Sequence, residues 1–303
     1  MLKIYTIIVT FNGMEWIEKN IQSLIISSIK TKIIIIDNGS SDGTQHAIKK
    51  YSEIQFIQSE ENLGFGKANN LGIKLALEQG ADYVFLLNQD AWIEKNTLSE
   101  LVKTAELDSS FGVISPIHLN GSGSGLDKLF SHCIAPSIHN MDHFYFSDVV
   151  LDKVKDFYQV PFINAAAWLL PKKTIEKVGF FDKLFYHYGE DVNYCQRVNY
   201  HDLKIIFVPV AKIYHDREIR EINLKNDTDI LTRKLKIELA NVNEPKSKIL
   251  ARFKYLKNSF LLSSLKDTLK FRSFKSNFKL YKFIANNKKN ILDSYECNRK
   301  TDN

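Results

Sequence analysis

The sequence has few cysteines, and their spacing excludes two classes of protein. Its three cysteines, Cys133, Cys195 and Cys297, are odd in number and lie far apart along 303 residues. A disulfide framework or a zinc site needs paired or clustered cysteines, so the sequence predicts neither. Free thiols fit a reducing compartment, and we expect a cytoplasmic protein.

The sequence also lacks a long hydrophobic run. No stretch reaches the about 18–20 apolar residues that a transmembrane helix requires. The apolar run at residues 3–11 is too short to span a bilayer, and no small-residue cleavage site follows it. We therefore expect a soluble protein, or one that contacts the inner face of the cell membrane peripherally.

The net positive charge of the chain comes from its C-terminal part. Residues 245–303 carry 15 Lys and Arg against 4 acidic residues, whereas the rest carry 26 against 31. Apolar residues recur at three-to-five-residue intervals in 249–284, a pattern typical of basic amphipathic helices on an anionic membrane surface. The alternative is a set of helices packed on the body with a solvated basic face. No recognition motif accompanies the charge, so we expect no nucleic-acid partner.

The first half of the sequence alternates strand-like and helix-like segments. The predicted strands are 4–11, 31–37, 54–62, 82–90 and 112–118, and the predicted helices are 14–28, 43–51, 66–80 and 96–107. This order predicts a Rossmann-like α/β fold, in which a mostly parallel sheet has helices on both faces.

Polar residues follow the ends of these predicted strands. In a parallel sheet such ends lie along one edge, at the crevice where ligands bind. The sequence therefore predicts a ligand site formed by the polar strand ends, which are Thr10, Asn12, Asp37, Asn38, Asn62, Asn88 and Asp90.

The second half of the sequence is less regular. Residues 119–158 read as an irregular region, and regular structure resumes with a strand to Leu170, a helix near Glu190 and short strands at 203–209 and 211–216. From about 228 onward the pattern is helical. We expect one domain over 1–216, with halves at 1–118 and 119–216, and a helical basic region over 217–303.

Five fragments appear in order: "IIVTFNG", "IIIIDNGSSDGT", "NLGFGKANNLGI", "DYVFLLNQDA" and "GEDVNYCQRV". Together they resemble the family 2 glycosyltransferases over roughly residues 3–216, especially bacterial rhamnosyltransferase-like and galactofuranosyltransferase-like members. The resemblance implies the glycosyltransferase A fold, inverting transfer from a UDP- or dTDP-sugar, and a divalent metal (Mn or Mg). It also implies a glycan or polyprenyl-linked acceptor in the synthesis of bacterial O-antigen or capsule. On this reading 1–118 binds the nucleotide-sugar and 119–216 binds the acceptor.

Asp37, in the second fragment, has two interpretations. On its own chemistry it forms a turn before the helix cap at 42–44. The resemblance implies instead that Asp37 contacts the pyrimidine, with Asn38 beside it and with Thr10, Phe11 and Asn12 lining the same pocket.

The third fragment is not a P-loop, because it lacks the required spacing of glycines and lysine. Its glycines allow a backbone to approach a ligand, and the helix that follows presents N–H groups to an anion. The resemblance implies nucleotide-sugar contacts from Asn62, Gly64, Lys67 and Asn69. The alternative is a structural glycine loop with an exposed lysine.

The fourth fragment resembles the family's metal-binding motif. Asn88 replaces the first of two aspartates, so Asp90 is the one charged ligand for an ion that bridges the donor phosphates. The resemblance implies that His215, after the last strand, is a further metal ligand, although a lone histidine is more often a surface residue.

The fifth fragment places Glu190 and Asp191 at a helix start, where the helix dipole stabilises carboxylates. The resemblance implies that Asp191 is the general base that deprotonates the acceptor, with Glu190 as a neighbour that orients it. For the acceptor we also consider His187, and Trp168 either as a sugar platform or as a core residue.

Two other functions stay open. A sugar nucleotidyltransferase would carry a glycine- and basic-rich loop directly after its first strand, and "VTFNGMEW" does not resemble one. A non-catalytic protein that binds nucleotide-sugars on the same fold is the second alternative, and the presence of both Asp90 and Asp191 counts against it.

Overall fold

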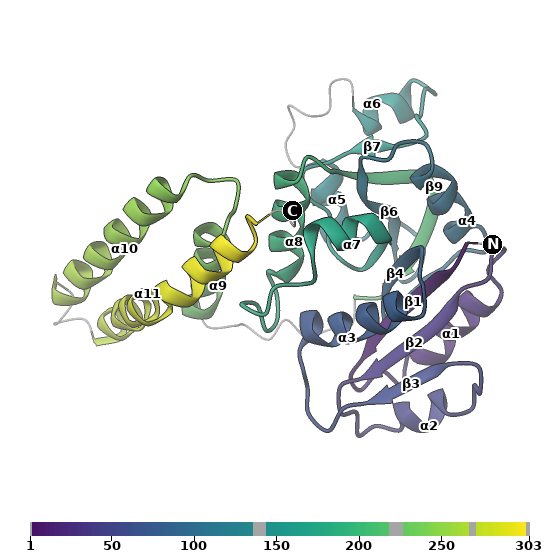
Figure 1. Cartoon of the computed structure of the whole chain (residues 1–303), viewed down its shortest axis with the longest axis horizontal. Helices are drawn as coiled ribbons and strands as arrows, with labels where there is room; N and C mark the ends of the chain where they lie inside the picture. Colours follow the sequence, from purple (N-terminus) through teal and green to yellow (C-terminus); the bar gives the residue numbers. More distant parts are fainter. Residues whose placement is uncertain (1, 136–143, 218–226, 267–270, 301–303) are drawn as a thin grey trace.

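The computed structural model describes residues 2–135, 144–217, 227–266 and 271–300. Within them, a nine-stranded sheet with helices on both faces forms the body, and three C-terminal helices lie beside it (Figure 1). The strand order is β3-β2-β1-β4-β8-β6-β9-β5, and β7 pairs with β9. The α/β fold class that the sequence predicts is confirmed.

The first four strands are parallel, and all of them except the edge strand β3 are buried on both faces. They are β1 (Ile4–Thr10), β2 (Lys32–Asp37), β3 (Gln55–Gln58) and β4 (Tyr83–Asn88), joined by α1 (Ile17–Ile25), α2 (Thr44–Ile48) and α3 (Phe65–Glu78). Along β2, Ile34 and Ile36 pack in the core that contains α3, whereas Ile33 and Ile35 pack in the core that contains α1. Burial of both faces explains why these strands read as continuous apolar runs.

The remaining strands run in both directions. β8 (Ala167–Pro171) is antiparallel to β4 and to β6 (Phe111–Asn120), β9 (Lys204–His215) is parallel to β6, and β5 (Ala91–Ile93) and β7 (Tyr158–Gln159) are antiparallel to β9. The sheet is therefore parallel in its first four strands and mixed beyond them.

Residues 203–209 and 211–216 were predicted as two strands, and the structure corrects this to one. Along β9, Val208 pairs with Pro116 but Lys212 pairs with Ile117, so a bulge separates the two halves of the strand. Pro209 lies in this bulge, where its missing N–H costs no ladder hydrogen bond.

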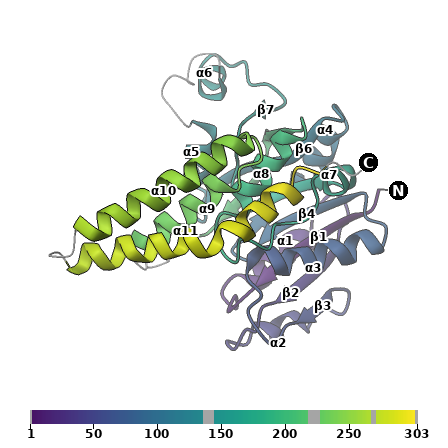
Figure 2. The ribbon, with the colours of Figure 1, turned by 60° about the vertical axis from the view of Figure 1, so that its left-hand side comes forward.

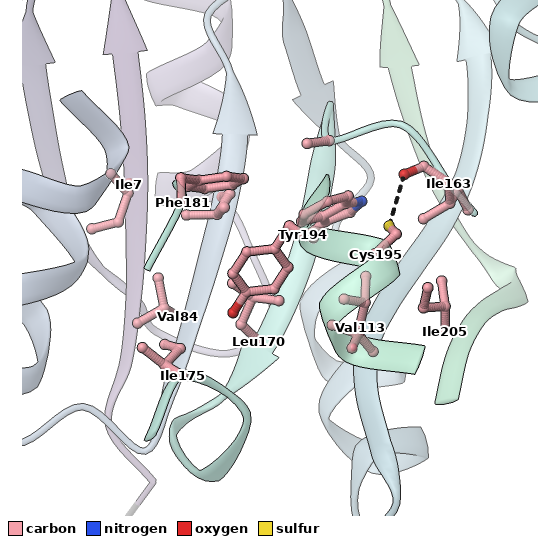
Figure 3. Close-up of a cluster of buried hydrophobic side chains, with 14 of the residues drawn as sticks. Ile7, Val84, Val113, Ile163, Leu170, Ile175, Phe181, Tyr194, Cys195 and Ile205 are labelled. Atoms are coloured by element: carbon pink, nitrogen blue, oxygen red, sulfur yellow. Dashed lines mark hydrogen bonds between the residues drawn. The ribbon is translucent and has the colours of Figure 1, made fainter. Parts of the chain in front are cut away.

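Five more helices cover the body: α4 (Thr97–Ala105), α5 (Lys128–Ile134), α6 (Tyr145–Val150), α7 (Lys172–Val178) and α8 (Glu190–Tyr200). Tyr194 and Cys195 of α8 are buried against the sheet near Leu170 and Phe181 (Figure 3). Cys195 Sγ also donates to the Ile163 carbonyl at 3.8 Å. This packing fixes α8, whose first residues reach the strand ends. All three cysteines are free, as the sequence predicts.

The C-terminal helices are α9 (Asp227–Leu239), α10 (Lys246–Lys266) and α11 (Phe271–Cys297). α10 and α11 form a hairpin that projects away from the sheet (Figures 1 and 2). Their own core includes Leu239, Phe253 and Ile284, and Ser294 Oγ donates to Asp182 Oδ2 at 2.5 Å to tie the hairpin to the body. The predicted region 217–303 is thus helical where described; 218–226, 267–270 and 301–303 lie outside the described residues.

The sequence predicts that any contact with a membrane is made at the protein surface, without a spanning helix. Among the helices that the structure describes, none has both the length and the apolar content needed to cross a bilayer.

Candidate functional site

The polar strand ends lie together at one edge of the sheet. Parallel pairing sets Thr10 opposite Asp37 in β2 and brings Asn88 to the other side of β1. β6 and β9 run in the same direction as β4, so their ends reach the same edge, with Asn120 opposite His215. Ligands of α/β sheets bind at this edge.

The loops after β1 and β2 are joined by hydrogen bonds. The Asn12 N–H donates to Ser40 Oγ at 2.8 Å, and Asn12 Oδ1 accepts from the Ser41 N–H at 2.9 Å. Asn12 has a φ of 49°, in the left-handed region that asparagine enters more easily than most residues. The amide of Asn12 therefore shapes the loop, while the neighbouring Phe11 exposes its ring at the edge.

Asp37 is fully buried and accepts hydrogen bonds from its own loop. Ser40 Oγ donates to one carboxylate oxygen, and Gln45 Nε2 donates to the other at 2.9 Å. Just before the helix that follows, Asp42 Oδ1 accepts from the Thr44 N–H at 3.1 Å, in a further local turn. The turn interpretation is what the structure shows, and contact between Asp37 and a pyrimidine stays a prediction.

The candidate asparagines around the glycine loop hold the loop itself. The bonds run from the Leu63 N–H to Asn38 Oδ1 (3.3 Å), from the Gly64 N–H to Asn62 Oδ1 (2.9 Å) and from Asn69 Nδ2 to the Phe65 carbonyl (3.0 Å). Lys67 is exposed, and its Nζ lies 3.9 Å from Glu61 Oε1. The asparagines therefore have structural roles, and a phosphate contact from Lys67 stays a prediction.

Gln89 has a role that no sequence pattern indicated. Its Oε1 accepts from Thr10 Oγ1 at 2.7 Å and from the Phe11 N–H at 2.8 Å. Its Nε2 donates back to the Phe11 carbonyl at 3.3 Å. Gln89 thereby fixes the end of β1 against the turn that carries Asp90. The contact follows from the adjacency of β1 and β4, a strand order that the sequence analysis did not predict.

Asp90 and His215, the two metal ligands that the resemblance implied, meet at this edge. Ala91 of β5 pairs with His215 of β9, so the preceding Asp90 lies against the imidazole. His215 Nε2 is 3.4 Å from Asp90 Oδ1 and 3.5 Å from Asn88 Nδ2. Asp90 and His215 are each 1% exposed. Two polar side chains, those of Asp90 and Asn88, thus converge on one imidazole nitrogen.

Two charged residues that sequence reasoning missed also contact His215. Asp127 Oδ2 lies 3.5 Å from His215 Nδ1, and Arg217 Nε lies 3.4 Å from the same carboxylate oxygen. Arg217 Nε is also 3.1 Å from Nδ1 and 3.2 Å from Nε2 of His215. The guanidinium therefore neutralises part of the negative charge that Asp90 and Asp127 bring to a buried place.

Asp191 reaches the same edge from α8. Its carboxylate accepts from the Val192 N–H at 2.8 Å and from the backbone of Ala165. The adjacent Ala166 carbonyl accepts from the Asn88 N–H at 2.9 Å, so Asp191 contacts the segment that borders the end of β4. Burial raises the pKa of Asp191, and the backbone N–H groups oppose this shift.

Glu190 is buried beside Asp191 at the start of α8. Burial, reinforced by the Asp191 charge, raises the pKa of Glu190 to about 7, although its own N–H and the Arg233 charge oppose the shift. Among the described residues, Glu190 Oε2 has no hydrogen-bond partner. Glu190 therefore carries a proton under conditions in which an ordinary glutamate is ionised.

The two acceptor candidates differ in exposure. Trp168 is fully buried and stacks on Phe181, with ring centroids 6.1 Å apart. A ring with no exposed surface offers no platform for a sugar, so the core interpretation of Trp168 is the correct one. His187 is exposed in the loop before α8 and packs against Tyr188, and an acceptor contact from it stays a prediction.

The donor set at the edge fits a divalent ion that shares its coordination with a ligand. No group of three or more His, Cys, Asp and Glu side chains within the described ranges has a metal-binding arrangement. Magnesium-type sites, however, usually combine one or two carboxylates with substrate phosphates. Asp90 Oδ1 and His215 Nε2 face one another at 3.4 Å, with Asn88 beside them, and would supply the protein's share.

Two solved structures have a similar overall fold. Staphylococcus aureus TarS, solved in complex with UDP-GlcNAc, has a TM-score of 0.61 at 15% identity and covers 98% of this chain and 90% of its own. GalNAc-T7, solved with UDP, GalNAc and Mn2+, has a TM-score of 0.60 at 14% identity, covering 95% of this chain and 55% of its own. These similarities confirm the glycosyltransferase A fold.

Relatives with similar sequences carry transferase names. The low-salt glycan biosynthesis hexosyltransferase Agl10 of Haloferax volcanii is 24% identical over 85% of this chain and 81% of its own. The dTDP-rhamnosyl transferase RfbF of Shigella flexneri is 22% identical over 86% of this chain and 79% of its own. The N-acetylglucosaminyl-diphospho-decaprenol L-rhamnosyltransferase of Mycobacterium tuberculosis is 23% identical over 69% of this chain and 74% of its own.

Residues 5–179 match the sequence profile described as Glycosyl transferase family 2. The match covers more than half of the chain and includes the elements from β1 to α7. Asp191 and His215 lie beyond it, so their assignment rests on the geometry of the edge. The chain belongs to glycosyl transferase family 2 and is a glycosyltransferase.

Proposed function

We propose that this protein is a metal-dependent, inverting glycosyltransferase that transfers a sugar from a UDP- or dTDP-sugar to a hydroxyl of a glycan or lipid-linked acceptor. One observation carries the proposal: Asp90 with His215, and Asp191, flank the end of β4 at the same sheet edge. The names of the relatives, a hexosyltransferase of glycan biosynthesis and two rhamnosyltransferases, support a role in glycan synthesis, and we propose that the product is a bacterial surface polysaccharide such as O-antigen or capsule.

The donor half would be 1–118. The joined loops after β1 and β2 would hold the base and ribose, with Asp37 and the exposed ring of Phe11 nearest to them. Asp90 and His215 would hold the metal, and Asn88 would contribute its amide oxygen after rotation of the side chain. When bound, the ion would neutralise charge on the departing diphosphate.

The acceptor half would be 119–216, and Asp191 would act in it as the general base. As the acceptor oxygen attacks the anomeric carbon, its proton passes to Asp191, and the bond from that carbon to the diphosphate breaks on the opposite face. This single in-line displacement inverts the configuration. Burial raises the pKa of Asp191, which makes it a stronger base than an ordinary aspartate.

The donor site is tested by calorimetric binding of UDP and dTDP, each with Mn2+ and with EDTA. We expect tight binding with Mn2+, weaker binding with EDTA, and loss of the difference in Asp90→Ala. Binding that ignores the metal in the wild type would overturn the metal assignment.

The base is tested by Asp191→Asn, which preserves shape. We expect transfer to fall by about 10²–10⁴-fold while nucleotide binding is kept. Asp202→Asn is the matched control, because Asp202 is an exposed aspartate just beyond the other end of α8. Tight nucleotide binding by the wild type without donor hydrolysis or transfer to any acceptor would favour the non-catalytic alternative instead.

We also propose that the helical region 217–303 brings the enzyme to the inner face of the cell membrane, where a polyprenyl-linked acceptor resides. Leu261 and Leu262 of α10 are exposed, and Lys254 and Lys257 are exposed one to two turns before them. Apolar side chains next to lysines suit anionic headgroups.

Sedimentation with phosphatidylglycerol vesicles tests this membrane contact. Binding should fall in Lys254→Glu/Lys257→Glu and with phosphatidylcholine alone, while Lys49→Glu/Lys50→Glu at the end of α2 should behave as the wild type. Equal sedimentation of the two double variants would refute the contact.

A further inference from the structure

We propose that Asp127 is a positioning residue for the metal ligand His215. The proposal rests on the metal site of the proposed function and adds a residue to which neither the sequence motifs nor the family match assigns a role. Asp127 Oδ2 lies 3.5 Å from His215 Nδ1, the nitrogen that faces away from Asp90.

The backbone holds Asp127 at the end of β6. The loop between them is closed by the Leu119–Leu126 bridge and by the Asn120 N–H, which donates to the Gly125 carbonyl at 2.9 Å. The Asp127 N–H then donates to the His118 carbonyl at 2.8 Å. Asp127 is thereby brought back to the edge where β6 pairs with the end of β9.

The two carboxylate oxygens of Asp127 make different contacts. Oδ1 accepts from the Phe130 N–H at 2.8 Å and caps α5. Oδ2 is left to face His215 and Arg217. The side chain is 3% exposed, so water does not compete for either oxygen. Capping therefore fixes the direction in which the carboxylate faces the imidazole.

This orientation selects one tautomer of His215. Arg217 Nε lies 3.1 Å from Nδ1 and 3.2 Å from Nε2, so it does not discriminate between the two ring nitrogens. The carboxylate of Asp127 faces Nδ1 alone and only accepts hydrogen bonds, so it favours the proton on that nitrogen. The lone pair of Nε2 then faces Asp90 Oδ1 at 3.4 Å, with Arg217 Nε 3.2 Å from Nε2, and both Nε2 and the Asp90 carboxylate would bind a metal cation placed between them. Histidines that bind metals commonly have a carboxylate on their other nitrogen, and removing it weakens metal binding by about 10–100-fold.

Asp127→Asn is the decisive variant, because asparagine caps a helix as well as aspartate does. Its Oδ1 can keep the bond to Phe130, while its amide donor then faces Nδ1 and favours the tautomer with the proton on Nε2. Asp108→Asn is the matched control, since Asp108 is paired with Lys204 at 2.8 Å before the start of β6, at the opposite sheet edge.

The measurement is Mn2+ affinity of the full-length protein by electron paramagnetic resonance, with saturating UDP or dTDP. We expect about 10–100-fold weaker Mn2+ binding in Asp127→Asn, unchanged affinity in Asp108→Asn, and unchanged nucleotide affinity in EDTA. Nitrogen-15 spectra should show His215 moving from the Nδ1-protonated to the Nε2-protonated tautomer.

Each outcome decides between the two proposals. Wild-type Mn2+ affinity in a folded Asp127→Asn overturns the role of Asp127 and leaves the proposed function standing. No metal-dependent nucleotide binding in the wild type overturns both. Should Asp127→Asn fail to fold, Asp127→Ser, which also caps α5, decides by the same Mn2+ titration.

Discussion

The close approach of Gly64 to Tyr186 allows a test of how the glycine loop positions the start of α8, which carries the proposed base Asp191. Its φ is 77° and its ψ is 169°, a backbone conformation that belongs almost entirely to glycine. A Cβ at this position would lie 2.2 Å from the carbonyl oxygen of Tyr186. Tyr186 belongs to the loop that leads into Glu190 and Asp191, so Gly64→Ala should disturb the start of α8.

The magnitude follows from two terms. The strained backbone costs about 1–3 kcal/mol, and the overlap adds about 1–3 kcal/mol. The overlapping atom is a backbone oxygen, which cannot rotate away, so the 184–189 loop must move by roughly 1 Å to regain van der Waals distance. A shift of that size at a reacting group costs about 10²-fold in rate.

The assays are thermal unfolding and initial transfer rate at a temperature at which the variant is folded. At about 2–4 °C per kcal/mol, we expect Gly64→Ala to lose roughly 10 °C in Tm and about 100-fold in transfer. Gly80→Ala is the matched control, because Gly80 has a φ of 81° but its Cβ would meet only the end of the Lys3 side chain. Equal activity of the two variants per folded molecule would refute the reasoning.

Three more predictions concern single side chains. The pKa of Glu190 is raised from 4.5 to about 7, so between these pH values the folded protein holds a proton that the unfolded chain releases. The free energy of unfolding should therefore fall by up to about 3 kcal/mol between pH 5 and 8, as measured by urea unfolding. Glu190→Gln should flatten this pH dependence. Trp168→Ala should lower stability by about 3–5 kcal/mol in urea unfolding, whereas Trp168→Phe should cost far less, because within the described residues Trp168 Nε1 has no hydrogen-bond partner. Gln89→Leu should free the loop that carries Phe11 and so weaken the binding of UDP or dTDP in calorimetry. The ratio of nucleotide affinities with Mn2+ and with EDTA, which depends on Asp90, should stay as in the wild type.

The strands and the shared edge were predictable because their signals are local. Runs such as the one ending at Asp37 are apolar throughout, since both faces of the parallel strands are covered. The direction of the later strands was not predictable in this way. β8 and β5 are antiparallel, and the pairing of Ala91 with His215 joins residues more than a hundred positions apart.

Asp127 and Gln89 show where sequence reasoning stops. Asp127 follows a Gly-Ser loop and ends no strand, so only the register of β6 with β9 brings it to His215. Gln89 lies between two candidate residues, yet its contact with Thr10 depends on β1 and β4 being neighbours. Local patterns carry no information on such registers, which the packing of the whole sheet determines.

The motif residues divide into those that shape the edge and those that face it. The amides of Asn12 and Asn38 join neighbouring loops, that of Asn62 bonds within its own loop and that of Asn69 bonds within α3. A side chain held in this way has little freedom to follow a ligand. The family's asparagine pattern thus specifies loop geometry more than chemistry. The proposed chemistry depends instead on the few buried charges near the end of β4. Among them, Asp127 lies on the Nδ1 side of His215, away from Asp90. Loss of Mn2+ affinity on its removal would show that this cluster of polar groups is organised to bind a metal.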